Sequence, residues 1–131
     1  MAKVPHYYNY ELMKAINGDK QMTDVWRLLA IAPLEKSCGK HPTQKPLSLM
    51  SRIILASTKK GDLILDPFCG SGTTGIAANL LERNFVGIER EREYVEVSQR
   101  RRLEVENPII AESYRTRIKD IDFVERYGCM L

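Results

Sequence analysis

A glycine-containing loop between an apolar run and a helix-like stretch constrains this chain more than any other feature. Residues 63–65 predict a short strand buried on both faces, and residues 66–73 follow it as a tight loop. Residues 85–88 then read as a second buried strand that ends at Glu89. Between loop and second strand, apolar residues recur at helical spacing, at Ile76, Ala77, Leu80 and Leu81. The order strand, loop, helix, strand predicts a βαβ unit and therefore a parallel sheet.

The remaining residues predict further helices around this unit. Pro46 suits the first position of a helix, which residues 59–61 would end. A charged helix is predicted over residues 91–105 and a single amphipathic last helix over residues 111–127. The side chains expected to face inward from these three helices are Leu47, Met50, Ile53, Ile54, Tyr94, Val95, Val97, Tyr114, Ile118, Ile121 and Val124.

Composition excludes several classes of protein. The 131 residues suit one domain, and 44% of them are hydrophobic, so a core can form. No apolar run approaches the roughly 18 residues that span a membrane, and the N-terminus lacks a signal-peptide pattern, so we expect a cytoplasmic protein without a membrane partner. Cys38, Cys69 and Cys129 are odd in number and widely spaced, which argues against a disulfide framework. Cys38 and His41 form a C-x-x-H pair without a second pair, so no metal site is predicted.

Positive charge is concentrated before the glycine loop. Residues 1–60 hold ten Lys or Arg against four Asp or Glu, residues 61–82 hold three acids and no base, and residues 83–131 hold ten of each. A polyanion would dock on the basic first part, although a solvated surface explains the same bias.

Two acidic residues flank the glycine loop and narrow the choice of ligand. Glu89 comes 19 residues after Gly70, at a strand end where a carboxylate accepts both hydroxyls of a ribose. Asp66 stands directly before the loop, where it would repel a pyrophosphate but suits an ammonium and a sulfonium group. An adenosine ligand that carries a methionine is therefore favoured.

Two other interpretations of the loop stay open. The string GSGTTG fits G-x-G-x-x-G, the pattern of dinucleotide sites. Pro67 and Phe68 argue against a dinucleotide, because they separate the strand from the first glycine, which such a site needs at the strand end. The third interpretation is a turn with a structural role alone.

Two motifs together resemble a known family. The string DPFCGSGTT with the downstream Glu89, and HPTQKP at residues 41–46, resemble the beta-group DNA amino-methyltransferases of type II restriction-modification systems. These enzymes methylate adenine at N-6 or cytosine at N-4. The resemblance covers residues 23–101 and implies an α/β, Rossmann-like, S-adenosylmethionine-dependent methyltransferase fold, here incomplete, with a partial parallel sheet and flanking helices. Residues 1–24 would be a remnant of the target-recognition region, and residues 25–131 the S-adenosylmethionine-binding part.

The resemblance also assigns residues to the cofactor S-adenosyl-L-methionine. Glu89 would hold the ribose, and residues 43–45 would close over the methionine carboxylate, with Lys45 as a partner of suitable charge. His41 is interpreted as structural. The complete predicted cofactor-binding set is Thr43, Gln44, Lys45, Asp66, Phe68, Cys69, Gly70, Ser71, Gly72, Thr73, Glu89 and Arg90.

The catalytic motif of that family is an Asp/Asn/Ser-Pro-Pro-aromatic loop, whose ring stacks on a base flipped out of the duplex. Residues 66–68 lack the second proline and lead into the glycine loop, and residues 107–109 lack both the second proline and the aromatic residue. No catalytic residue is therefore assigned. Three origins fit this pattern: a subunit of a split enzyme, the product of an interrupted gene, and an excised fragment.

The leading hypothesis is the S-adenosylmethionine-binding portion of a site-specific DNA methyltransferase, adenine-specific in preference to cytosine-specific and inactive as an isolated chain. Its partners would be double-stranded DNA and a complementary methyltransferase half, or a second copy, because half a sheet exposes an apolar edge. A non-catalytic binding module, a truncated gene product, and a methyltransferase acting on RNA or a small molecule are the alternatives. Residues 100–102, three arginines among acids, are interpreted as an ordinary charged helix face.

Overall fold

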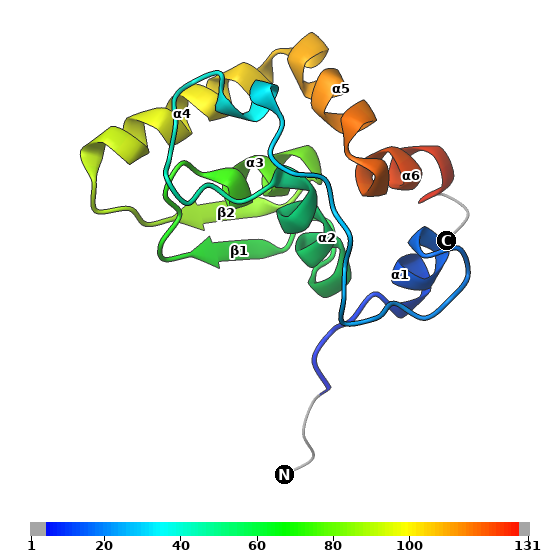
Figure 1. Ribbon diagram of the computed structural model, residues 1–131. Helices are drawn as coiled ribbons and strands as arrows, with labels where there is room; N and C mark the ends of the chain where they lie inside the picture. Colours follow the sequence, from blue (N-terminus) through cyan, green and yellow to red (C-terminus); the bar gives the residue numbers. More distant parts are fainter. Residues whose placement is uncertain (1–4, 129–131) are drawn as a thin grey trace.

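The computed structural model describes residues 5–128, and helices make up most of it (Figure 1). Cys129 lies outside the described residues. The chain runs through α1 (Tyr10–Ile16), the 3-10 helix η1 (Pro33–Lys36), α2 (Leu47–Ser57), β1 (Leu63–Asp66), α3 (Thr73–Leu80), β2 (Asn84–Gly87), α4 (Arg92–Glu106), α5 (Pro108–Arg117) and α6 (Lys119–Tyr127).

The two strands and the helix between them form the predicted βαβ unit. Strands β1 and β2 pair in parallel, with Leu63 opposite Asn84 and Asp66 opposite Gly87. The ladder continues past the strand ends, where the backbone N–H of Ile88 donates to the Asp66 carbonyl over 2.9 Å. This continuation fixes the glycine loop against the residues that follow β2.

The core lies among the helices. Helix α2 packs along α3 and also contacts α1 and α6, while α4 packs on α3 and α5. The strands add only half-buried side chains, Ile64 and Phe85. The buried cluster consists of Leu12, Leu47, Ile54, Leu55, Ile76, Ala77, Ala78, Leu80, Leu81, Val105, Ala111, Tyr114, Ile118 and Ile121.

The opposite face of the sheet is open, contrary to the prediction of strands buried on both faces. Leu63 is 67% exposed and Leu65 is 61% exposed, and Val86 on β2 is also exposed. Alternate residues of a strand point to opposite faces, so these side chains share the face that no described helix covers. In Figure 1, β1 forms the outer edge of the molecule. We call this surface, with the exposed Ile88, the open sheet face.

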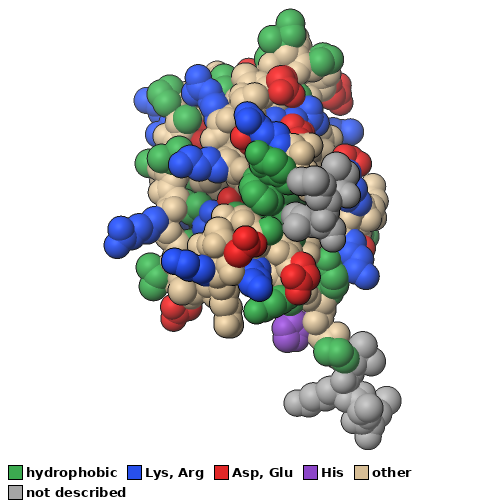
Figure 2. Space-filling view, turned by 90° about the vertical axis from the view of Figure 1, so that its right-hand side faces the viewer, with side chains coloured by type: hydrophobic (Ala, Val, Ile, Leu, Met, Phe, Trp, Pro, Cys, Tyr) green, Lys and Arg blue, Asp and Glu red, His purple; other side chains and the backbone are tan. Residues whose placement is uncertain are grey.

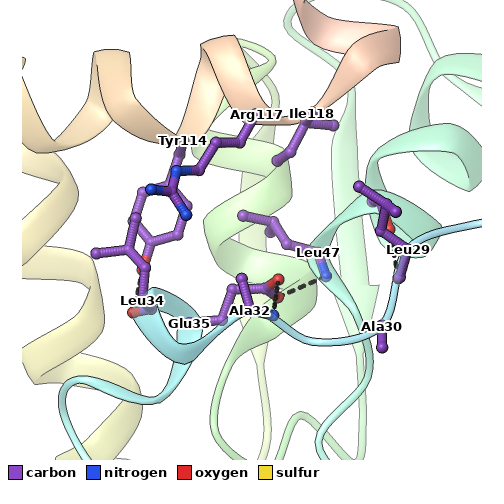
Figure 3. A pocket seen from close by; sticks show the side chains of 10 residues that line it. Leu29, Ala30, Ala32, Leu34, Glu35, Leu47, Tyr114, Arg117 and Ile118 are labelled. Carbon is purple, nitrogen blue, oxygen red and sulfur yellow. Dashed lines mark hydrogen bonds between the residues drawn. The ribbon is translucent and has the colours of Figure 1, made fainter.

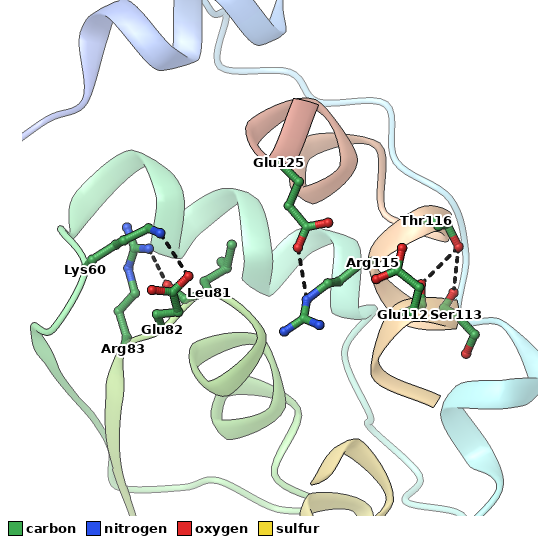
Figure 4. Close-up of polar contacts among 9 residues, drawn as sticks. All are labelled: Lys60, Leu81, Glu82, Arg83, Glu112, Ser113, Arg115, Thr116 and Glu125. Carbon is green, nitrogen blue, oxygen red and sulfur yellow. Dashed lines mark hydrogen bonds and ion pairs between the residues drawn. The ribbon is translucent and has the colours of Figure 1, made fainter. Parts of the chain in front are cut away.

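The predicted single last helix is wrong, because α5 and α6 are separate. Ile118 takes an extended conformation, with φ −96° and ψ 99°, and its buried side chain joins the core at the turn. The turn lets both short helices face the core. Arg115 and Glu125 then meet across the bend over 3.0 Å (Figure 4). Pro108 starts α5, where the Asn107 side chain accepts a hydrogen bond from the N–H of Ile109.

Helix α2 is held by polar contacts at its start and on its flank. The Glu35 carboxylate accepts hydrogen bonds from the N–H groups of Ala32, over 3.0 Å, and of Leu47, over 2.8 Å, at the edge of a small apolar pocket (Figure 3). The helix begins at Leu47, one residue after the predicted Pro46. On the flank, Arg52 makes two hydrogen bonds to the Asp120 carboxylate on α6, over 2.7 and 2.9 Å.

Figure 2 shows the face of the molecule on the right-hand side of Figure 1. Lys and Arg side chains lie among Asp and Glu side chains there, and hydrophobic side chains gather near the middle. This face therefore carries charge of both signs. Within residues 5–128, no helix combines the length and the apolar character that crossing a membrane requires.

Candidate functional site

The glycine loop between β1 and α3 is shaped by close approaches that only glycine permits. Gly70 and Gly72 have φ values of +52° and +78°, the left-handed region that side chains disfavour. A Cβ on Gly72 would lie 2.6 Å from the Cβ of Ser98 on α4, and one on Gly70 would lie 3.1 Å from Nε2 of His41. The loop is thus pressed between α4 and the segment that contains His41.

Asp66 closes β1 and is oriented by the loop that follows it. Its Oδ1 accepts a hydrogen bond from the N–H of Phe68 over 3.1 Å, and its Oδ2 accepts one from Oγ1 of Thr74 over 2.6 Å. A carboxylate has about four acceptor positions, so Asp66 retains capacity for a cationic or hydroxyl group of a ligand. Thr74 was not predicted, yet it sets the orientation of this acid.

Glu89 ties the loop to the end of β2. Its Oε2 accepts from the N–H of Gly70 over 3.0 Å, and its Oε1 accepts from the N–H of Glu91 over 2.8 Å. These backbone hydrogen bonds, that of Glu91 foremost, lower the pKa of Glu89 below its ordinary value. The carboxylate is therefore ionised at neutral pH. Burial, and after it the charge of Asp66, raises the pKa of the neighbouring Cys69 thiol, which stays protonated.

The segment at residues 41–46 forms the other wall of a pocket of about 130 Å³. Nζ of Lys45 donates to the Thr43 carbonyl over 3.0 Å. Gln44 is buried and turns its amide toward η1, where Nε2 donates to the Glu35 carbonyl over 2.8 Å. The pocket is lined by His41, Thr43, Gln44, Lys45, Met50, Asp66, Phe68, Cys69, Gly70, Ser71, Thr73 and Thr74.

Most of the predicted cofactor-binding residues thus surround one pocket, and three do not. Glu89 and Arg90 line a neighbouring hollow, which shares the exposed Phe68 with the pocket. Gly72 lies behind the loop, against α4. His41, interpreted as structural, lines the pocket while its Nδ1 accepts from the N–H of Thr43 over 3.2 Å.

One correction concerns the arginine run on α4. Arg100 and Arg102 are exposed, as expected of a charged helix face, but Arg101 is only 2% exposed. Its position falls on a helical stripe with Tyr94, Val97 and Val105, and this spacing was the available signal. The positive charge of residues 100–102 favoured the interpretation of all three arginines as exposed.

The chain matches the family model for DNA methylases, N6_N4_Mtase, over residues 2–100. It is 59% identical over 118 residues to the type II methyltransferase M2.MboI of Moraxella bovis, an alignment that covers 90% of this chain and 43% of the relative. It is 60% identical over 105 residues to the type II methyltransferase M2.DpnII of Streptococcus pneumoniae, covering 80% of this chain and 39% of the relative.

The chain is also similar to a solved structure. The crystal structure of the M1.HpyAVI-SAM complex superimposes with a TM-score of 0.54 at 48% sequence identity, over 63% of this chain and 41% of that one. The fold is therefore part of the Rossmann-like α/β fold of S-adenosylmethionine-dependent methyltransferases. The chain spans about two fifths of the length of the curated relatives named above. By the extent of the family match and the identity to these methyltransferases, the chain belongs to the N6/N4 DNA methylase family.

Proposed function

We propose that this chain binds S-adenosylmethionine and supplies the cofactor site of a DNA methyltransferase that acts on an exocyclic amine, with adenine N-6 favoured over cytosine N-4. One observation carries the proposal. Two segments separated by about 20 residues in the sequence, at residues 41–46 and 66–74, meet as opposite walls of one pocket, and the second segment contributes the oriented carboxylate of Asp66. Relatives named as type II methyltransferases and a structural neighbour named as a SAM complex support it.

The charges of the pocket suit this ligand. S-adenosylmethionine carries an ammonium, a sulfonium and a carboxylate on its methionine part, and when bound it supplies an electrophilic methyl group. Asp66 would hold the cationic part, and Lys45 with the N–H groups at the start of α3 would hold the carboxylate. Glu89 keeps acceptor positions beyond those used by Gly70 and Glu91, which the ribose hydroxyls would fill.

The open sheet face supports a second element of the proposal, a complementary polypeptide segment. Leu63, Leu65, Val86 and Ile88 present apolar side chains on a sheet face without a covering helix in the described part of the chain. Exposed strand edges and apolar faces favour association. We propose that this face packs against sequence outside these 131 residues, which also carries the Pro-Pro-aromatic loop, and that DNA is bound by both parts together.

Reconstituted methyl transfer tests the function. The chain is mixed with the portion of M2.MboI that lies outside the aligned region, and transfer of labelled methyl from S-adenosylmethionine to duplex DNA is measured. We expect transfer in the mixture and none with either part alone. The Asp66→Ala variant should abolish it, and Glu96→Ala, which removes an exposed acid paired with Arg92 on the surface of α4, should not.

Product analysis separates the alternatives. Methylated adenine in the DNA supports the favoured specificity, whereas methylated cytosine corrects it. Binding of S-adenosylmethionine by a well-folded mixture that transfers nothing to DNA would identify a non-catalytic binding module and would overturn the proposed activity.

A further inference from the structure

One face of α4 supports both walls of the pocket. The Tyr94 ring packs against His41 of the first wall in a tilted arrangement, with ring centroids 4.1 Å apart and an interplanar angle of 58°. One turn further along, Ser98 meets the backbone of the glycine loop so closely that a Cβ on Gly72 would come within 2.6 Å. Arg101 follows at the next turn of the same face. Helix α4 therefore connects the two segments that form the pocket.

Arg101 holds the glycine loop from behind. Its Nη1 donates to the Ser71 carbonyl over 2.8 Å, to Oγ of Ser71 over 3.1 Å and to Oγ1 of Thr73 over 3.0 Å. The N–H of the same Ser71–Gly72 peptide donates to the Cys69 carbonyl over 2.8 Å. This peptide unit is thus fixed at both ends, and Thr73, the first residue of α3, is fixed with it.

The guanidinium is costly to place there. Arg101 is 2% exposed, and within residues 5–128 no carboxylate pairs with it at salt-bridge distance and its Nε and Nη2 have no hydrogen-bond partner. Burial lowers the pKa of Arg101, which shows that the surroundings disfavour its charge. The charges of nearby groups, among them Glu35 and Glu104, offset only part of this effect, so we expect Arg101 to add little to the stability of the fold.

We infer that Arg101 is a positioning residue, which fixes the glycine loop in the conformation that binds the cofactor although it does not itself line the pocket. This inference rests on the proposed binding of S-adenosylmethionine. Ser71 and Thr73 belong to the pocket wall, and Arg101 contacts both from the opposite side. Without it, the Ser71–Gly72 peptide loses its anchor to α4, and the wall becomes mobile.

The Arg101→Met variant separates positioning from stability. Methionine preserves much of the length of the side chain and removes the uncompensated charge, so the free energy of unfolding should be unchanged or higher. The affinity for S-adenosylmethionine should fall by about ten- to a hundredfold, by analogy with the loss of groups that orient metal ligands from outside. Hydrogen exchange at the amides of residues 68–74 should become faster. Arg101→Lys, which keeps a charge and donors, should recover part of the affinity.

Arg102→Met is the matched control, because Arg102 is the exposed neighbour on the same helix. It should change neither the affinity nor the exchange of the loop amides. Unchanged affinity in Arg101→Met would overturn the inference. So would an equal loss of affinity and of unfolding free energy, or a variant that does not fold, since both indicate a purely structural residue.

The test remains decisive if the proposed ligand is wrong. A wild-type chain that does not bind S-adenosylmethionine contradicts the proposed function, and amide exchange then judges Arg101 without a ligand. Faster exchange at residues 68–74 in Arg101→Met supports the anchoring of the loop, and unchanged exchange contradicts it.

Discussion

The two faces of the small sheet differ sharply in how they are packed. On the covered face, the Phe85 ring lies so close to Gly75 and Gly87 that a Cβ on either glycine would come within 2.8 Å of it. On the open sheet face, Leu63 and Leu65 leave more than half of their surface exposed. The same two-stranded sheet thus contributes to a tight interior on one side and to a bare apolar surface on the other.

The two faces of the sheet therefore have different roles: the covered face supports the pocket, and the open sheet face is the docking surface of the proposed function. The pocket is built on the covered side, where α4 and α2 support its two walls. The exposed side chains of Leu63, Leu65 and Val86 do not line the pocket, and the apolar character of the open sheet face makes it a docking surface in the proposed function. Variants that act on one side alone therefore test the division.

The buried ion pair on the helical side should be the most sensitive point. Asp120→Ala leaves the half-buried Arg52 without its carboxylate partner, and we expect a loss of up to about 3 kcal/mol in the free energy of unfolding, the lower end for a fully buried pair. Asp122→Ala is the control, because its pair with Arg126 lies at the surface and should cost less than about 1 kcal/mol. Chemical denaturation measures both, and similar losses would contradict the burial of the first pair.

Gly72→Ala should disturb the contact between the loop and α4. A left-handed alanine costs about 1–2 kcal/mol, and the clash with Ser98 adds about 1–3 kcal/mol. Gly18→Ala has a similar φ of +65° with nothing within 4 Å of the added Cβ, so it reports the backbone cost alone. If thermal unfolding shows the same loss for both variants, the loop is not pressed against α4.

Adjacent residues of β1 compare the two faces directly. Ile64→Ala removes packing against the helical core and should cost about 1–2 kcal/mol, since Ile64 is half-buried. Leu65→Ala should change the stability of the isolated chain by no more than about 0.5 kcal/mol. Urea unfolding of the two variants checks this, and a larger loss for Leu65→Ala would show that the open face is covered in solution.

The smallest effect concerns pH. Backbone hydrogen bonds lower the pKa of Glu89 in the folded protein below the ordinary value of 4.5. The ionised carboxylate, which accepts from the N–H of Gly70, therefore stabilises the fold fully above pH 4.5. This stabilisation is lost as the pH falls through the pKa of the folded state. An NMR titration should show a midpoint below 4.5 at the Glu89 carboxyl and at the Gly70 amide together. In Glu89→Gln the backbone amide of Gly70 should no longer titrate with this midpoint. A midpoint at or above 4.5 in the wild type would contradict the hydrogen bonds to the Glu89 carboxylate.

The pattern of the sequence was sufficient for the βαβ unit and for the glycine loop, which forms one wall of the pocket. Three features of the sequence indicate local backbone geometry: the glycine spacing, the acid at a strand end and the proline at a helix start. Local geometry determines the positions of Asp66 and Glu89. The pairing of residues 41–46 with the loop came from the family resemblance, and the structure brings both segments to one pocket.

Features that depend on contacts between residues far apart in the sequence could not be predicted from the local sequence pattern. Ile118 looked like one more inward position of a long helix, but burial at the bend favours an extended residue there. An apolar run predicts a strand buried on both faces, but Leu63 and Leu65 are exposed on the face that no described helix covers, because hydrophobicity alone does not determine burial. The charge of Arg101 favours an exposed position, but its spacing along α4 corresponds to the buried face, where the structure places it.

The most direct test of the cofactor site is a calorimetric titration of the chain with S-adenosylmethionine, run beside one with NAD. The proposed function predicts saturable binding of S-adenosylmethionine at one site, loss of that binding in Asp66→Ala and Glu89→Ala with the fold retained, and no binding of NAD. Binding of NAD, or unchanged affinity for S-adenosylmethionine in both variants, would contradict the assignment of the pocket.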